Sequence, residues 1–128
     1  YVASLAAIVR PRAEQKRGIV FDVDYQGARQ IRAVRPDTIS VFVLPPSLEE
    51  LRVRLRGRGS DDDEVIERRF NKARLEIEQY GLFDYIVVND DLDRAKLRMR
   101  SIIEAERAKR PRMAHQAELL LRPGRTLR

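Results

Sequence analysis

Three short apolar runs alternate along the chain with longer stretches in which apolar residues recur at helical spacing. The runs are residues 19–23, 39–44 and 85–88, each of strand length and rich in valine and isoleucine. Strands separated by long helical crossovers pair in parallel, because a parallel connection needs a dozen or more residues. The pattern predicts an α/β fold in which these runs form parallel strands of one sheet. The second run is apolar apart from Ser40, so we expect it to be buried on both faces.

Sequence signals mark the ends of the helical stretches. A helix is expected over residues 26–35, and a second begins at the capping box of residues 47–50, where a serine precedes a glutamate by three positions. Acidic residues at 61–63 open the next helix, because negative charge near a helix N-terminus is favoured by the helix dipole. A further helix follows residues 89–91, and a short one is expected around residues 114–121.

Two carboxylates stand at the end of the first apolar run. Asp22 and Asp24 are followed by Gln26 and Gly27, where the next helix begins. The carboxyl ends of parallel strands are where ligands bind, and carboxylate oxygens suit Mg²⁺ or another polar ligand. The alternative is an acidic surface loop between a strand and a helix. This segment alone leaves both interpretations open.

Composition argues against several classes of function. The chain has no cysteine and a single histidine, His115, which disfavours disulfides, thiolate metal sites and His-based catalytic triads. The net charge of +6 resides in residues 107–128, since residues 1–106 hold 19 basic and 19 acidic side chains. That basic end has no aromatic residue for base stacking, so we expect no nucleic-acid partner. No run approaches the ~20 apolar residues of a membrane span, so we expect no membrane contact. The absence of cysteine fits a cytoplasmic protein, and we expect that location.

Four segments carry a resemblance to a known family. They read DVDYQG at residues 22–27, PPSLEELRVRLRGRGS at 45–60, ERRFNKA at 67–73 and FDYIVVNDD at 83–91. In this order and at this spacing they resemble guanylate kinase over residues 18–106. The chain contains no Gly-x-x-x-x-Gly-Lys-Ser/Thr, the loop that cradles phosphates in P-loop enzymes. It therefore resembles the second half of the family and lacks the first.

The resemblance implies an incomplete parallel sheet of a P-loop nucleoside monophosphate kinase-like fold. Residues 1–106 would form the core segment, with a helical lid over about 57–72, and residues 107–128 a basic tail. The implied reaction is ATP-dependent phosphorylation of GMP to GDP, with Mg²⁺ accompanying ATP. Without the phosphate loop, we expect this chain to be inactive alone. Gly57 and Gly59 predict that the lid moves relative to the sheet.

Arginines beside these glycines match the catalytic lid arginines of the family. They are Arg54, Arg58 and Arg69, which the resemblance places on the nucleotide phosphates, Arg54 and Arg58 also as ATP contacts. A guanidinium is permanently charged and forked, so it grips phosphate oxygens bidentately. The alternative is a set of surface arginines paired with the acidic residues Asp61 to Glu64 and Glu67. We expect that alternative for three others: Arg52, Arg56 and Arg68.

The remaining assignments concern the substrates and the metal. By resemblance, Asp22 faces the phosphates and holds Mg²⁺ through water, while Asp24 accepts the N1 and N2 donors of guanine. Tyr1 resembles a family tyrosine that touches the GMP phosphate, although Val2 stands where the family has glycine. Asn89 matches a family position that lies near the adenine of ATP. Alternatively, Asn89 caps the helix that follows it.

An interaction domain is the alternative function. Guanylate-kinase-like scaffold domains keep the fold and hold partner peptides in the GMP cleft, and a scaffold has no need of lid arginines. Retention of Arg54, Arg58 and Arg69 together with both aspartates therefore favours the enzyme. We expect GMP and ATP as partners. A homodimer is a further possible partner state that the sequence does not decide.

Overall fold

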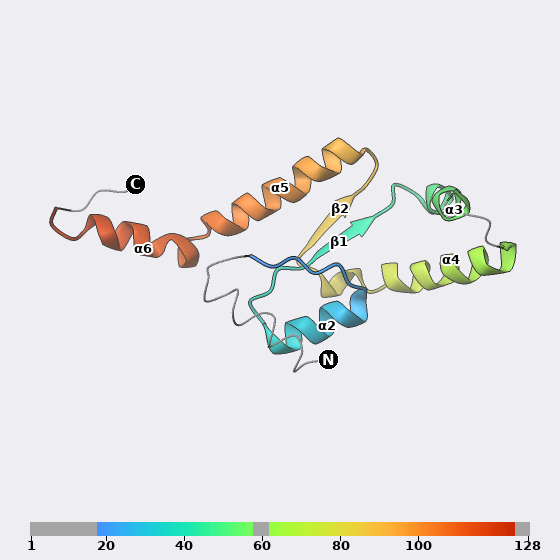
Figure 1. Cartoon of the computed structure of the whole chain (residues 1–128), viewed down its shortest axis with the longest axis horizontal. Helices are drawn as coiled ribbons and strands as arrows, with labels where there is room; N and C mark the ends of the chain where they lie inside the picture. The colour runs from blue at the N-terminus through green and yellow to red at the C-terminus, as the bar shows by residue number, and fades with distance from the viewer. Residues whose placement is uncertain (1–17, 58–61, 125–128) are drawn as a thin grey trace. The chain divides into compact units, whose positions relative to one another are not determined.

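The computed structural model describes residues 18–57 and 62–124 of the 128-residue chain. The fold divides into two units, one ending at Val88 and the other beginning at Asn89. Tyr1 and Arg58, both expected in the site, lie outside the described residues. In chain order (Figure 1) the elements are α2 (Tyr25–Val34), β1 (Val41–Leu44), α3 (Leu48–Arg56), α4 (Asp63–Ile77), the 3₁₀ helix η1 (Tyr80–Leu82), β2 (Tyr85–Val88), α5 (Leu92–Ala108) and α6 (Arg110–Leu120).

The two strands of the first unit confirm the α/β class and the parallel pairing of the second and third apolar runs. β1 and β2 lie side by side in one parallel sheet, with Leu44 opposite Val88 at their carboxyl ends (Figure 1). Val87 is only 2% exposed, and Phe42 stacks on Phe83 with ring centroids 4.6 Å apart. Because the strands are parallel, both end at the same edge of the sheet.

The first apolar run does not form the expected strand. Residues 18–24 adopt no regular structure, and the Val20 side chain is 91% exposed. A strand exists only through ladder hydrogen bonds to a neighbour, and β1 and β2 pair with each other rather than with this run. The prediction of a strand over residues 19–23 is therefore wrong. Burial of the second run on both faces is also wrong, since Val43 is 48% exposed.

An ion-pair network joins α2 to the residues that precede the two strands. The Arg32 guanidinium donates to the Leu82 carbonyl at 2.9 Å, to Ser40 Oγ at 3.0 Å and to the Asp84 carboxylate. Asp84 Oδ2 also accepts from Ser40 N at 2.8 Å and from Ser40 Oγ at 2.9 Å. Partial burial alone would raise the pKa of Asp84, but hydrogen bonds from Ser40 and Arg32 outweigh it and hold that pKa below its usual value. The network fixes α2 against the strands.

Helix positions in the first unit follow the sequence signals closely. α2 lies within one residue of the expected 26–35 and buries Ile31. α3 begins after Ser47, whose Oγ accepts from Glu50 N at 3.0 Å, as a capping box requires. α4 buries Ile66 and Phe70, which are four residues apart and so lie on one face of the helix.

The second unit consists of α5 and α6. Lys109 separates them with a backbone outside the helical region, and Pro111 stands in the first turn of α6, where its missing N–H costs no helical hydrogen bond. Lys109 Nζ lies 2.7 Å from Oε1 of the buried Glu106. α6 confirms the short helix expected around residues 114–121, although it begins at Arg110. Over residues 18–57 and 62–124, no helix is long and apolar enough to cross a membrane.

Candidate functional site

The two aspartates of the DVDYQG segment flank the start of α2. Asp24 is the N-cap residue, and its Oδ1 accepts a hydrogen bond from Gly27 N at 2.9 Å. Both Asp22 and Asp24 are exposed to solvent. Because Oδ1 of Asp24 serves the helix end, Oδ2 is the oxygen that faces a ligand most readily. The loop therefore presents two accessible carboxylates with one of them fixed in direction by the helix.

Gly27 allows this loop to approach the first turn of α2. A Cβ at position 27 would lie 2.8 Å from Val23 Cβ and 3.3 Å from both Val23 Cγ atoms. Val23 Cβ cannot rotate away, so the backbone between Asp22 and Asp24 would have to move. The sequence alone does not reveal this close approach, which becomes apparent only from the distance to Val23.

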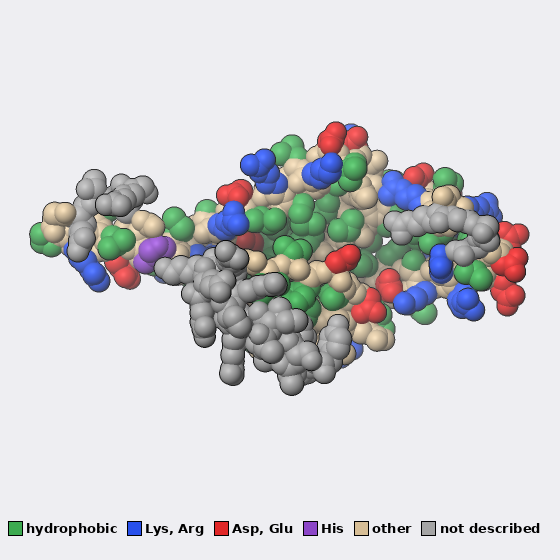
Figure 2. Space-filling view, in the orientation of Figure 1, with side chains coloured by type: hydrophobic (Ala, Val, Ile, Leu, Met, Phe, Trp, Pro, Cys, Tyr) green, Lys and Arg blue, Asp and Glu red, His purple; other side chains and the backbone are tan. Residues whose placement is uncertain are grey.

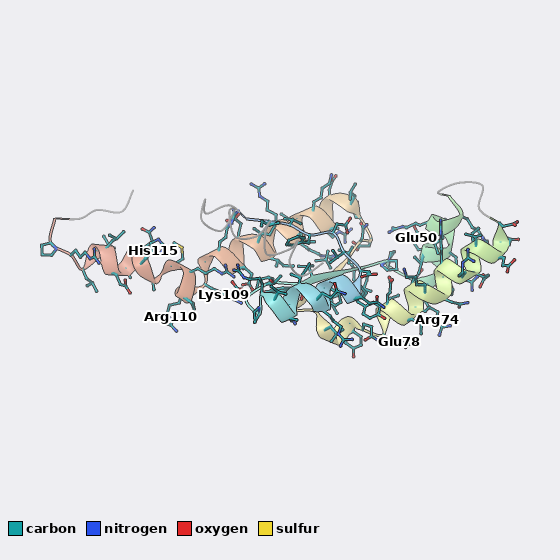
Figure 3. All side chains as sticks on the ribbon, turned by 60° about the horizontal axis from the view of Figure 1, so that its bottom comes forward. Glu50, Arg74, Glu78, Lys109, Arg110 and His115 are labelled. Carbon is teal, nitrogen blue, oxygen red and sulfur yellow. The ribbon has the colours of Figure 1, made fainter. Side chains whose placement is uncertain are left out.

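The lid arginines that the structure describes lie on a hairpin of α3 and α4, two helices in mutual contact. Arg54 is half-buried on α3, and its Nε donates to Glu50 Oε1 at 2.8 Å, one helical turn earlier. Figure 3 labels Glu50 on α3. Arg69 is exposed on α4. Figure 2 shows both basic and acidic side chains over these two helices.

Arg52 connects the two helices. Its guanidinium forms an ion pair with Glu67 on α4 and lies over the ring of Phe70, with the guanidinium carbon 3.9 Å from the ring centroid. The expectation that Arg52 pairs with a neighbouring acid is thereby confirmed for Glu67. The contact with Phe70 was not predicted, because the apolar spacing of α3 does not show which of its arginines reaches Phe70 on α4.

Asn89 does not cap the helix that follows it. The N-cap of α5 is Asp91, whose Oδ1 accepts from Arg94 N at 2.9 Å, so the capping alternative for Asn89 is wrong. Asp90 accepts from Asp91 N at 2.8 Å and pairs with Arg94 and Arg98 at 3.6 and 3.4 Å. The hydrogen bond from Asp91 N, followed by the charges of the two arginines, lowers the pKa of Asp90. Asn89 itself directly follows β2.

The fit of a Mg²⁺ ion depends on Asp22. No group of three or more histidine, cysteine or acidic residues that could hold a metal occurs within the described part of the chain. Mg²⁺ is commonly held by one or two carboxylates together with substrate phosphates and waters, so an all-protein cage is not needed. The exposed Asp22 carboxylate suits that mode of binding, with most of the ligands coming from nucleotide and solvent.

The structure thus brings the candidate residues together in two places of the first unit. Asp22 and Asp24 share the loop before α2, and Arg54 and Arg69 share the α3–α4 hairpin. Asn89 opens the second unit. Carboxylates on a glycine-supported loop and arginines on a helical hairpin are the groups needed to bind a base, a metal and phosphates.

Comparison with known proteins identifies a family. The model of the guanylate kinase family matches residues 1–106. The chain is 48% identical over 117 residues to guanylate kinase of Chromobacterium violaceum, an alignment covering 91% of this chain and 56% of that protein. It is 50% identical over 103 residues to guanylate kinase of Alcanivorax borkumensis, covering 80% and 50% of the two chains. The chain spans about half the length of these curated relatives.

Proposed function

The chain belongs to the guanylate kinase family, and we propose that it is the lid-bearing part of an enzyme that transfers the γ-phosphoryl group of ATP to GMP. One observation carries the proposal most directly. Arg54 and Arg69, which match the family's lid arginines, lie on two helices in contact, where two guanidinium groups can serve one set of phosphates. Phosphoryl transfer depends on positioning and charge neutralisation, and arginines supply both.

The loop before α2 serves the acceptor nucleotide in this proposal. Guanine presents the N1–H and N2–H₂ donors on one edge, and Asp24 offers carboxylate oxygens as matching acceptors. The hydrogen bond from Gly27 N orients that carboxylate before GMP arrives. Adenine lacks this pair of donors, so a fixed carboxylate discriminates against AMP. We further propose that Tyr1 contacts the GMP phosphate.

ATP and its metal complete the site. Asp22 would hold Mg²⁺ through water, and a metal held there would supply positive charge that offsets the charge of the phosphates. Arg54 and Arg58 would contact the ATP phosphates, and Asn89 would lie near adenine. Arg54 reaches this role by exchanging Glu50 for a phosphate oxygen, since an i,i+4 pair on a helix surface contributes only about 0.3–0.5 kcal/mol.

Steady-state kinetics on the whole protein that carries this chain test the proposal. Arg54→Ala should lower kcat by roughly 10²-fold or more while changing KM for GMP little, because the lost contact strengthens in the transition state. Arg56→Ala is the matched control, an exposed arginine on the same helix. The 128-residue chain alone should show no phosphotransfer, because no Gly-x-x-x-x-Gly-Lys-Ser/Thr loop occurs in it.

A second variant tests the acceptor side. Asp24→Asn keeps an oxygen that can cap α2 but presents an amide donor against guanine's donors, so the preference for GMP over AMP should fall. Kinetics with both acceptors measure that preference. If Arg54→Ala and Asp24→Asn both leave turnover unchanged, the enzyme proposal fails. Binding of a protein partner, lost in the same variants, would then support the scaffold function instead.

A further inference from the structure

Arg52 makes two different contacts across the α3–α4 hairpin. Its guanidinium pairs with Glu67 and covers one face of the Phe70 ring at 3.9 Å. Phe70 is buried, only 5% exposed, so Arg52 covers part of a small core formed by described residues of the first unit. A cation over an aromatic ring is attracted by the negative face of the ring, and the attraction grows as the contact is desolvated. The paired contacts fix both the position and the plane of the guanidinium.

Helix geometry separates Arg52 from the arginine that follows two residues later. Two residues correspond to about 200° of rotation around an α-helix. When Arg52 faces α4, Arg54 therefore faces away from it, on the side where Glu50 stands. On α4, Arg69 directly precedes Phe70 and is exposed, whereas Phe70 is buried. We call the contacts of Arg52 with Glu67 and Phe70 the clamp. The clamp and the lid arginines thus occupy different faces of the same two helices.

We propose that Arg52 is a positioning residue, which holds α3 against α4 so that Arg54 and Arg69 keep a fixed spacing. The proposal rests on the proposed function, because the spacing matters only if both arginines serve the phosphates. Displacement of a reacting or binding group by about 1 Å can cost on the order of 10²-fold in rate. A contact that prevents α3 from rotating or sliding on α4 therefore has a kinetic consequence, although Arg52 touches no substrate.

The side-chain chemistry favours arginine over lysine at this position. A planar guanidinium stacks on a ring and donates in its own plane at the same time, so it can contact Phe70 and Glu67 together. An ammonium group is a compact, strongly hydrated charge that satisfies only one of these contacts well. Arg52→Lys should therefore keep the ion pair, lose the stack, and give an intermediate phenotype.

A distance measurement on the 128-residue chain tests the clamp independently of activity. The chain has no cysteine, so spin labels attach only at cysteines introduced at the exposed positions of Glu49 on α3 and Arg74 on α4. Figure 3 labels Arg74 near the end of α4. The distance distribution should broaden or shift in Arg52→Ala and Phe70→Leu, and stay unchanged in Arg56→Ala. An unchanged distribution in Arg52→Ala would overturn the clamp.

Kinetics on the whole protein test the positioning role. Arg52→Ala should lower kcat by roughly 10-fold to 10²-fold with KM for GMP nearly unchanged, Arg52→Lys should recover part of the loss, and Arg56→Ala should match the unmutated protein. Rates are divided by the folded fraction from circular dichroism, because a purely structural role reduces only that fraction. An active unmutated protein with equal Arg52→Ala and Arg56→Ala rates would overturn the positioning role alone. Absence of phosphotransfer in the unmutated protein would instead overturn the proposed function.

Discussion

Gly27→Ala is the substitution for which the structure gives the sharpest expectation. The new methyl group would lie 2.8 Å from Val23 Cβ and 3.3 Å from both of its Cγ atoms. The nearest atom is bonded directly to the Val23 backbone, so no side-chain rotation relieves the contact. Either α2 moves away from the loop, or the loop that carries Asp22 and Asp24 moves away from α2.

The expected cost follows from two opposing effects. Adding a methyl group to a close-packed contact costs about 1–3 kcal/mol. Replacing glycine by alanine inside a helix recovers about 0.5–1 kcal/mol, because alanine loses less backbone freedom on folding. The free energy of unfolding should therefore fall by roughly 0–2.5 kcal/mol, the range of differences between these figures, with its middle at about 1.25 kcal/mol. The steric overlap is on average the larger of the two effects, so the expected change is destabilising.

Urea unfolding followed by circular dichroism measures this change, with Gly81→Ala as the matched control. A Cβ at Gly81 meets nothing within 4 Å, and Gly124 is the only glycine with positive φ among the residues described. Gly81→Ala should be neutral or stabilise by about 0.4–1 kcal/mol through the unfolded state. In the whole protein, Gly27→Ala should also weaken the preference for GMP over AMP. Equal unfolding free energies for the two variants would refute the reasoning.

Further predictions concern the strand network and the start of α5. Asp84→Ala should lower the free energy of unfolding by about 1–2 kcal/mol, since it removes hydrogen bonds from Ser40 and the ion pair with Arg32. Urea titration measures this change, and a loss below about 0.3 kcal/mol would contradict the prediction. Because the pKa of Asp84 is lower in the folded chain, the contribution of its carboxylate to the free energy of unfolding is complete above the usual carboxyl pKa of 3.8. That contribution is lost as the pH falls through the folded pKa, so acid should destabilise the unmutated chain more than the Asp84→Ala variant. Asp91→Ala should cost about 1 kcal/mol by removing a helix cap, whereas Asn89→Ala should cost little; thermal melts that rank them in the opposite order would contradict the cap assignment.

Local signals in the sequence were sufficient for the helices and for one pair of strands. Ser47 fixes the start of α3 because its hydroxyl caps the helix, and this choice depends only on nearby residues. The parallel pairing of β1 and β2 followed from the two apolar runs and the long helical connection between them. The run over residues 19–23 has the same apolar character, but no strand pairs with it among residues 18–57 and 62–124, and pairing cannot be predicted from one run alone.

Contacts between distant residues account for what the sequence did not predict. Arg32 and Asp84 are 52 residues apart, and neither position carries a signal for the other. At the start of α5, three consecutive polar residues could each act as a cap, and the register of the helix selects Asp91 over Asn89. The carboxylates of the candidate site were recognisable because they belong to a contiguous motif. Their support by Gly27 became apparent only from the 2.8 Å approach to Val23.

Arg52 and Arg54 show why residue type does not assign function on this hairpin. Both are arginines on one helix, and both have an acidic partner. Arg54 pairs with Glu50 on its own helix, a contact of about 0.3–0.5 kcal/mol that a phosphate group can replace without separating any two elements. Replacing the partners of Arg52 would break the contact between α3 and α4 and uncover Phe70. A phosphate-binding arginine must be able to exchange its partner, so the replaceable pair of Arg54 supports the proposal that Arg54, rather than Arg52, binds phosphate.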